Sequence, residues 1–364
     1  MKIKVKSNNQ TMNNNPLVTV AIPVYNAERF LPSGLDSLWS QTYQNFEILL
    51  ADDGSTDATP SLCDEIAAKD GRVRVLHYQH QGVGAMRNAL VENAKGDYLY
   101  FFDIDDQIEP ELLERNVEAM EEGGYDMIFF GFEVVNQQLN LKDQVRMSRH
   151  TVQTNDEFRD YYCNVLAGMD YGCGYLPTKF FRCAFLRPLF EGGNRFEHVS
   201  MHEDEIFLLG LFKHVGRTCS LPDVFYHYII YPKGNATTAF RRDGLDNTVR
   251  LFRKRMELYR TWVGDCPGLM KIYREQLLVA ASCGLMKPQY YASSGMNAAE
   301  HIRYIARTLA LPEVRECAAH CRIPLADSPK SIFAKLMDSA FYSNRPLLFY
   351  AVRCLRDFHK KRKR

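Results

Sequence analysis

The chain lacks the features that mark membrane-spanning, secreted and thiolate-metal proteins. No stretch reaches 18 apolar residues, so we predict no transmembrane helix. The 10 cysteines form no Cys-x-x-Cys pair, and we interpret them as reduced thiols in a reducing compartment. The net charge is only +1, so composition gives no reason to expect a nucleic-acid partner.

The N-terminal residues also lack the apolar core of a secretory signal. Residues 1–15 are basic and then rich in asparagine, and we expect them to form a flexible tail. Translation from Met12, just before the first predicted strand, is an alternative start. These features together favour a cytoplasmic protein.

Two familiar motifs are incomplete. The run Gly82-Val83-Gly84-Ala85-Met86-Arg87 ends in arginine, so it is not a dinucleotide-binding fingerprint. Cys317, His320 and Cys321 have the spacing of one helix face and suggest zinc. A fourth ligand at the usual spacing is missing, which favours side chains that bind no metal.

What the chain does contain is aspartates directly after apolar runs. Residues 98–102 are apolar or aromatic, which is typical of a strand buried on both faces, and Asp103, Asp105 and Asp106 follow them. Crowded carboxylates repel one another unless a cation lies between them. We therefore predict a hard divalent ion here, Mn²⁺ or Mg²⁺, that carries the oxygens of a diphosphate.

Two more strand ends point to the same site. Residues 46–51 run into Asp52 and Asp53, and residues 18–22 run into Pro23-Val24-Tyr25-Asn26. Ligands of open α/β sheets bind outside the carboxyl ends of the strands. If these strands are parallel, all three ends share one rim of the sheet.

The wider pattern predicts the fold class. Strands and helices alternate from residue 16 to about residue 132, which predicts an α/β fold with a mostly parallel central sheet flanked by helices. Helical patterns dominate from about residue 243. We expect a main domain at 16–240, a helical C-terminal region at 241–345 and a basic amphipathic tail at 346–364.

Three segments carry a resemblance to a known family. The segment from Ala21 to Asp57 resembles the opening of family 2 glycosyltransferases, whose GT-A fold is Rossmann-like. Residues 82–106 resemble that family's run from a Gly-x-x-x-x-Arg-Asn turn to its Asp-x-Asp strand end, and residues 202–207 resemble its Glu-Asp-x-x-Phe motif. The resemblance covers roughly residues 17–240, with the motifs in the family's order. Within that family, the chain resembles the glycosyltransferases of the bacterial surface-polysaccharide type.

The resemblance implies a nucleotide diphosphate sugar as donor, with a UDP-sugar favoured. Asp105 is expected to touch the metal and Asp103 to contact the ribose or a metal-bound water. Which of Asp103, Asp105 and Asp106 coordinates the ion directly stays open. Donor contacts are expected at Pro23, Tyr25, Asn26, Asp52, Asp53, Gly82, Arg87 and Asp103.

Individual donor contacts follow from residue type. Tyr25 is expected to pack on the base, and Asp52 or Asp53 to accept a hydrogen bond from the uracil N3–H. Arg87 has two possible roles: it approaches the donor sugar or diphosphate, or it braces the aspartates by ion pairing.

Asp204 is the catalytic base that the resemblance implies, with Glu203 and Glu205 as fallbacks. Such a base takes the proton from an acceptor hydroxyl as it attacks. One base and no enzyme nucleophile imply inversion at the anomeric carbon. We expect the acceptor to be a glycan or lipid-linked molecule in cell-surface polysaccharide or lipopolysaccharide synthesis.

The sequence departs from the family at several positions. His80 stands where asparagine is common, Met86 where alanine is common and Ala236 where serine is usual. These changes keep open a catalytically inactive sugar-nucleotide-binding protein. A sugar-1-phosphate nucleotidylyltransferase is another alternative, but it requires a Gly-rich loop after the first strand, and AIPVYN has none.

Two residues and the tail complete the predictions. Lys179 is expected to be structural or to face the acceptor, and His227 to be a further metal ligand or an ordinary core or surface histidine. Residues 353–364 hold seven basic residues and only one acid. With Leu348, Val352, Leu355 and His359 on one helical face, the tail is typical of a basic segment that anchors a protein to an anionic membrane surface. We therefore predict peripheral attachment to the inner face of the cell membrane.

Overall fold

The protein is described from a computed structural model that covers residues 15–136, 141–168, 174–231, 243–286, 295–323 and 332–362. The chain divides into two compact units. Unit 1 comprises Met1–Asp160, Gly174–His198 and Glu203–Pro232, and unit 2 comprises Tyr161–Cys173, Val199–His202 and Lys233–Arg364. The domain boundary expected near residue 240 stays a prediction.

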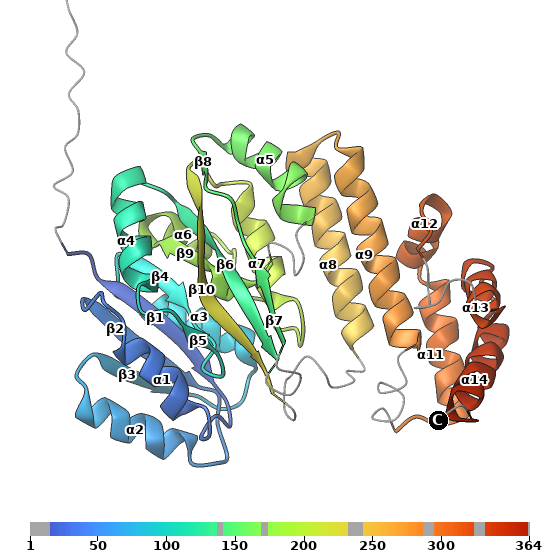
Figure 1. The fold of residues 1–364 in the computed structure, drawn as a ribbon, viewed down its shortest axis with the longest axis horizontal. Coiled ribbons are helices and arrows are strands. Elements are labelled where there is room, and N and C mark those ends of the chain that lie inside the picture. The colour runs from blue at the N-terminus through green and yellow to red at the C-terminus, as the bar shows by residue number, and fades with distance from the viewer. Residues whose placement is uncertain are drawn as a thin grey trace, which may run out of the picture. The chain divides into compact units, whose positions relative to one another are not determined.

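Unit 1 is built on one mixed sheet (Figure 1). Its first half is a parallel array of β1 (Val18–Val24), β2 (Phe46–Asp52), β3 (Val73–His77) and β4 (Tyr98–Phe101). The second half adds β9 (Lys179–Arg182), β6 (Met127–Asn136), β10 (Thr218–Ile230) and β5 (Gln107–Ile108). The order is β3-β2-β1-β4-β9-β6-β10-β5, with β7 (Leu141–Val145) on β6 and β8 (His150–Val152) on β10.

Strand direction confirms the predicted mostly parallel sheet. Strand β9 is antiparallel to both of its neighbours, whereas β6 and β10 are parallel to each other. The buried run at residues 98–101 lies beside β1, and every residue of β4 is buried. Long apolar runs without alternation form these strands because both faces of the sheet are covered.

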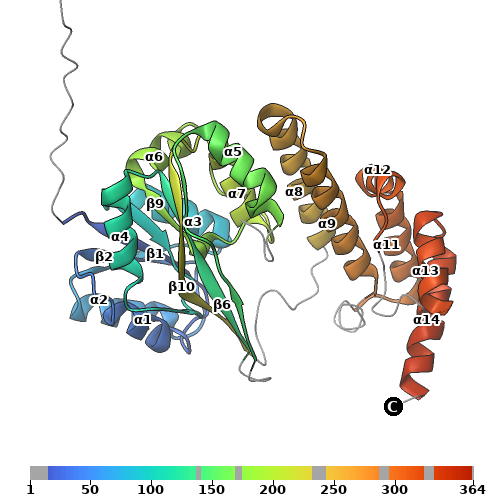
Figure 2. The same cartoon turned by 45° about the horizontal axis from the view of Figure 1, so that its top comes forward.

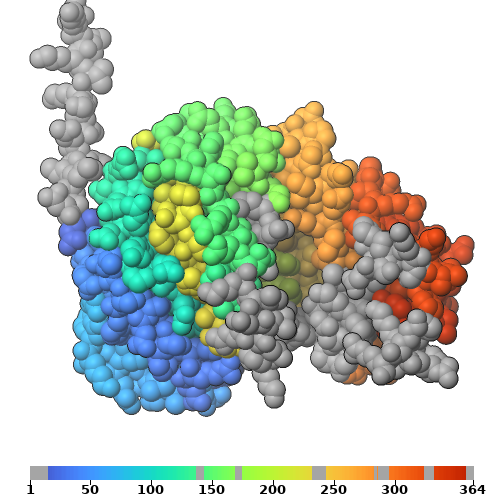
Figure 3. All heavy atoms as spheres, viewed as in Figure 1, coloured from blue at the N-terminus to red at the C-terminus, as the bar shows by residue number. Residues whose placement is uncertain are grey.

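Helices cover both faces of the sheet (Figures 1 and 2). Helices α1 (Leu31–Trp39), α2 (Thr59–Lys69) and α4 (Leu112–Gly123) share one hydrophobic core with alternate residues of β1, β2 and β4. Helix α3 (Val83–Asn93) packs on β1 and β2 from the other side, as right-handed crossovers require. In the space-filling view, α1, α2 and α4 form the blue and teal surface of unit 1 (Figure 3).

Three shorter segments complete unit 1. They are α6 (Cys183–Glu191), α7 (Glu203–Phe212) and the 3₁₀ turn η2 (Leu176–Thr178), and α5 (Asn155–Asn164) begins in this unit. Helix α7 starts with three acidic residues, which suit the positive end of the helix dipole.

The start of α2 differs from what its sequence indicates. Thr59-Pro60 is typical of an N-cap followed by proline at the first helical position, but Thr59 is already helical and Ala58 occupies the cap position. The Thr59 hydroxyl instead accepts a hydrogen bond from the Ala27 N–H at 2.7 Å, and Asp57 accepts from the Thr59 N–H at 3.0 Å. The hydroxyl therefore ties α2 to the loop after β1.

Unit 2 is helical, as predicted for the C-terminal region. It contains α8 (Gly244–Leu258), a π-turn η4 (Tyr259–Val263), α9 (Pro267–Met286), α11 (Ala298–Ala310), α12 (Pro312–His320), α13 (Ile332–Tyr342) and α14 (Pro346–Arg362), together with the 3₁₀ turn η1 (Leu166–Gly168). None of the helices in the described ranges is long and apolar enough to cross a membrane.

The basic tail is helical but not fully exposed. In α14, Phe349, Val352 and Arg353 are buried, and the helix packs against α11 and α13 (Figure 2). Leu355, which the sequence places on the same face as Val352, is 59% exposed. Part of the predicted membrane-facing side is therefore covered by the helices of unit 2 itself.

Helix α1 touches the turn after β4 at a glycine. A Cβ atom on Gly34 would lie 2.3 Å from the carbonyl oxygen of Ile104 and 2.8 Å from its Cδ1. Ile104 lies between Asp103 and Asp105, so a glycine at this position lets the acidic turn rest on α1.

We expect Gly34→Ala to destabilise the protein by about 1–3 kcal/mol, because the backbone carbonyl of Ile104 must move to make room. Urea unfolding measures this change. Gly71→Ala is the matched control, since no atom lies within 4 Å of a Cβ at Gly71. Equal stabilities of the two variants would contradict the close packing of α1 on the acidic turn.

Candidate active site

The carboxyl ends of three parallel strands meet at one rim of the sheet, as predicted. Val24 at the end of β1 lies in register with Asp52 at the end of β2. Ala21 lies in register with Phe101, the last residue of β4. The loops that follow these strands therefore emerge side by side, and they carry most of the predicted site residues.

A single buried arginine joins the predicted aspartates. Arg87 Nη2 donates to Asp103 Oδ1 at 3.2 Å, and Arg87 Nη1 donates to Glu203 Oε1 at 2.8 Å. The same Nη1 also donates to Asp204 Oδ1. These ion pairs are those of the bracing role, and a contact of Arg87 with the donor stays a prediction.

The surroundings make these ion pairs strong. Only 4% of the Arg87 side chain is exposed, against 26% for Asp103, 14% for Glu203 and 16% for Asp204. A charge pair attracts more strongly where water is excluded. The three carboxylates accordingly raise the pKa of Arg87, so the guanidinium stays charged.

Asp204 differs from an ordinary surface aspartate. Burial raises the pKa of its carboxyl to about 8, with smaller upward effects from Glu203 and Asp103. Arg87 and a hydrogen bond from the backbone of Leu176 act in the opposite direction. A carboxylate whose pKa is close to neutral accepts protons far more readily than one near 4.

Helix α7 is held against α3 by a segment that sequence analysis missed. Asn88 donates to the Phe196 carbonyl and accepts from the Phe196 N–H, both at 2.9 Å. The Phe196 ring stacks on Phe207 of α7 with centroids 3.9 Å apart. A Cβ on Gly84 would lie 2.6 Å from the Glu197 carbonyl, so this segment passes directly over the helix. No motif in the sequence signals Phe196.

The acidic turn after β4 has two parts with different surroundings. Burial, and then the charge of Asp103, raises the pKa of Asp105 to about 6. Burial also raises the pKa of Asp103, while Arg87 lowers it. These two carboxylates lie close enough to repel each other, as the sequence suggested.

Asp106 faces elsewhere. It is 2% exposed, and its Oδ1 accepts from the Ile229 N–H at 2.8 Å. Its Oδ2 accepts from the hydroxyls of Tyr226 and Tyr175, the latter at 3.3 Å. Both oxygens of Asp106 therefore bind β10, and Oδ2 also binds Tyr175, the residue before η2. No sequence pattern indicates the Tyr175 contact.

The donor set suits a hard divalent ion only in part. Asp103 and Asp105 supply carboxylate oxygens whose repulsion a cation would relieve. No group of three or more His, Cys, Asp or Glu in the described ranges is arranged to hold a metal. Mg²⁺ and similar ions are often bound through one or two carboxylates plus water and phosphate oxygens, so two carboxylates fit an ion that arrives with a diphosphate.

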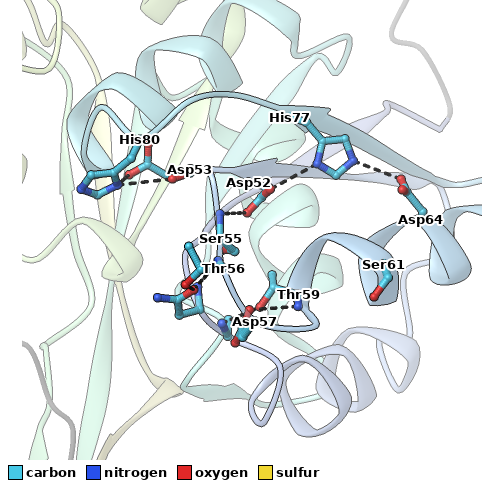
Figure 4. Close-up of polar contacts among 12 residues, drawn as sticks. Asp52, Asp53, Ser55, Thr56, Asp57, Thr59, Ser61, Asp64, His77 and His80 are labelled. Atoms are coloured by element: carbon cyan, nitrogen blue, oxygen red, sulfur yellow. Dashed lines mark hydrogen bonds and ion pairs between the residues drawn. The ribbon is translucent and has the colours of Figure 1, made fainter.

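The Asp52-Asp53 pair organises the neighbouring loops (Figure 4). Asp52 accepts from the Ser55 N–H at 3.1 Å and contacts His77 Nδ1 at 3.2 Å. The other nitrogen of His77 contacts Asp64 at 3.1 Å, and these two carboxylates raise the pKa of His77 despite some desolvation.

Asp53 supports the start of α3. Its Oδ1 accepts from the Gln81 N–H at 2.7 Å and its Oδ2 from the Gly82 N–H at 2.9 Å. The side chain is 4% exposed and also pairs with His80 Nδ1 at 2.8 Å. Gly82 has φ 95°, a conformation that glycine adopts without strain.

Asn26 joins the loops that follow β1 and β2 through hydrogen bonds. Its side-chain oxygen accepts from the Thr56 N–H at 2.8 Å, and its own N–H donates to Ser55 Oγ at 2.9 Å. Asn26 has φ 48°, in the left-handed region that asparagine tolerates better than most residues. Pro23 lies just before it, within β1.

Tyr25 presents an aromatic surface at the rim. The side chain is 48% exposed, and its ring stacks on His80 with centroids 4.6 Å apart and planes 29° from parallel. His80, one of the departures from the family pattern, thus forms a two-ring platform with Tyr25.

Other predicted residues lie apart from this cluster. His227 lies between Glu109 at 2.8 Å and Glu133 at 3.1 Å, and Lys179 is buried with Nζ donating to the Tyr175 carbonyl at 2.6 Å. His320 bonds the Glu316 carbonyl at 2.8 Å. Ala236 lies outside the described residues.

Removal of Arg87 should strongly destabilise the protein. We expect Arg87→Met to lower the free energy of unfolding in urea by about 3–5 kcal/mol at neutral pH, because it leaves partly buried carboxylates without a counter-charge. Arg115→Met is the control, since the Arg115–Glu118 pair is exposed and should contribute about 0–1 kcal/mol. Adding Glu203→Gln and Asp204→Asn to Arg87→Met should restore part of the loss. A loss as small as that of Arg115→Met would contradict the bracing role.

Several known glycosyltransferases have sequences similar to this chain. A family model described as "Glycosyl transferase family 2" matches residues 19–187. The Bacillus subtilis protein named "Uncharacterized glycosyltransferase EpsJ" is 26% identical over 280 residues, which is 74% of this chain and 78% of EpsJ. Glycosyltransferase GlyG of Streptococcus pneumoniae is 37% identical over 113 residues, 31% of this chain and 38% of GlyG.

Solved structures share the fold. S. aureus TarS 1–349 in complex with UDP-GlcNAc has a TM-score of 0.61 and 18% identity, covering 93% of this chain and 90% of that one. The mannosyltransferase PcManGT from Pyrobaculum calidifontis, in complex with GDP-Man and Mn²⁺, has a TM-score of 0.50 and 17% identity, covering 96% of this chain and 89% of that one. Residues 19–187 of the chain therefore match a family 2 glycosyltransferase domain, and the fold is GT-A-like.

Proposed function

We propose that the protein transfers a sugar from a nucleotide diphosphate sugar, with UDP-sugar favoured, to a hydroxyl of a glycan or lipid-linked acceptor. The observation that carries this proposal is the link through Arg87 between Asp103 and Asp204. It joins the acidic turn proposed to face the diphosphate to the carboxylate proposed to face the acceptor.

Asp204 is proposed as the base. Its carboxylate takes the proton of the acceptor hydroxyl while the hydroxyl oxygen forms its bond to the anomeric carbon. The bond from that carbon to the diphosphate breaks in the same step, and the diphosphate leaves with the electron pair. Attack on the face opposite the leaving group inverts the anomeric configuration.

Asp103 and Asp105 are proposed to hold Mn²⁺ or Mg²⁺ together with the donor. When bound, such an ion neutralises charge on the departing diphosphate. Asp106, with both oxygens bound within the protein, is proposed to fix the turn rather than to act as a ligand.

The nucleoside is proposed to lie on the Tyr25–His80 platform. Asp52 and Asp53 both have partners within the protein, so their proposed part is to shape the loops around the base. Pro23, Asn26 and Gly82 contribute backbone to the same rim. A hydrogen bond from the nucleotide base to Asp52 or Asp53 would be accepted by a carboxylate oxygen that already accepts one hydrogen bond within the protein. It would use the second lone pair of that oxygen.

The donor proposal is tested by a thermal-shift panel of UDP-, GDP- and dTDP-sugars with Mn²⁺, with Mg²⁺ and with chelator. A donor at about 100 times its Kd should add about 2.7 kcal/mol to the free energy of unfolding.

Asp204→Asn should keep the shift but slow transfer or slow donor hydrolysis by about 10²–10⁴-fold, because only the proton acceptor is lost.

Glu205→Gln is the matched control on the same turn of α7, and it should leave both readouts close to those of the unaltered protein. A larger loss in Glu205→Gln than in Asp204→Asn would assign the base to Glu205. A shift without any turnover in the unaltered protein would favour the inactive binding protein.

We further propose that the end of α14 holds the protein on anionic membrane surfaces, close to a lipid-linked acceptor. Residues 360–364 are all lysine or arginine, and Leu347 and Leu355 of α14 are exposed. Each basic residue near anionic lipid contributes about 1 kcal/mol. Arg353 is buried and is not part of this charge.

Replacing residues 360–364 by glutamine in the full chain should abolish co-flotation with vesicles that contain phosphatidylserine at physiological salt. Glutamine keeps the helix propensity close to that of lysine and arginine, so α14 itself should persist. Vesicles of phosphatidylcholine alone are the control and should bind neither protein. Unchanged binding of the substituted protein to anionic vesicles would refute the anchor.

A further inference from the structure

Arg87 is one source of positive charge beside the acidic turn. That guanidinium is 4% exposed and is already bound by three carboxylates. Little of its charge is therefore left for a leaving diphosphate, and a second cationic side chain at this rim would stabilise that group further. The loop that follows β1 supplies one.

Arg29 lies in that loop, two residues before α1, and is exposed. Its guanidinium carbon lies 4.3 Å from the centre of the Phe30 ring and 5.4 Å from that of Tyr231. The two rings are themselves packed, with centroids 5.0 Å apart. A guanidinium held over aromatic faces has fewer orientations to lose when it binds an anion.

The aromatic pair also connects Arg29 to the acidic turn. The Tyr231 hydroxyl donates to the backbone carbonyl of Asp105 at 2.9 Å. Burial raises the pKa of Asp105, and the charge of Arg29 opposes that rise. Arg29 therefore stands at the same rim as Asp103 and Asp105, on the side of β1.

We propose that Arg29 is a diphosphate-binding residue, which pairs with the phosphate oxygens of the donor and takes up charge as they leave. The inference rests on the proposed function, since it presumes a nucleotide diphosphate at this rim. When the bond between the anomeric carbon and the β-phosphate oxygen breaks, its electron pair stays on that oxygen. The fixed guanidinium stabilises the added negative charge.

The test compares a nucleoside diphosphate with the matching monophosphate, so that the second phosphate is the only difference. Isothermal titration calorimetry with chelator present measures UDP, UMP, GDP and GMP binding to the unaltered chain and to Arg29→Met. Methionine keeps an unbranched apolar stem against Phe30 but carries no charge. Arg115→Met, an exposed arginine of α4, is the control for loss of one positive charge.

We expect Arg29→Met to weaken binding of the diphosphate by about 10-fold or more, as loss of a charge-assisted hydrogen bond does, and that of the monophosphate by less than about 2-fold. Arg29→Lys should lie between the two, because it keeps the charge without the bidentate fork. Arg115→Met should leave both affinities unchanged.

Other outcomes separate the two proposals. Unaltered binding of UDP and GDP by Arg29→Met, or an equal loss for the diphosphate and the monophosphate, overturns the role of Arg29 and leaves the proposed function standing. Failure of the unaltered protein to bind any of the four nucleotides, with chelator and also with Mn²⁺, overturns both.

Discussion

The buried ion pairs of Arg87 are the constraint on which the site depends. One guanidinium from α3 reaches the turn after β4 and the first turn of α7, which are distant in sequence. Without it these carboxylates would lie in the protein with no counter-charge, which is unfavourable because desolvation of a carboxylate is costly. Because the Arg87 guanidinium pairs with both Asp204 and Asp103, it also holds the proposed base close to the acidic turn.

Much of the fold could be predicted from local pattern. The strands at residues 18–22, 46–51 and 98–102 are uninterrupted apolar runs, and polar residues mark where each ends. Parallel pairing then places Asp52 and Asp103 at one rim. Residue composition and the uninterrupted apolar pattern are enough to predict these strands, because a strand that is buried on both faces is apolar along its whole length.

The contacts between distant segments could not be predicted in the same way. Arg87 and Asp204 are 117 residues apart, and no local pattern states which acid the arginine will meet. The buried side of α14 was also hidden, since an apolar stripe looks the same whether it faces lipid or the neighbouring helices α11 and α13. Arg29 lies in the segment that resembles the family, but no sequence pattern assigned it a role, and only its packing on Phe30 and Tyr231 distinguishes it from a surface arginine.

The tyrosine contacts of Asp106 change how the acidic turn must be dissected by mutation. Because this carboxylate anchors the turn to β10, an asparagine or alanine in its place would loosen Asp103 and Asp105 without removing either. Activity would fall as though a metal ligand had been lost. A scan of the three aspartates therefore overcounts ligands unless each variant is also examined for displacement of its neighbours.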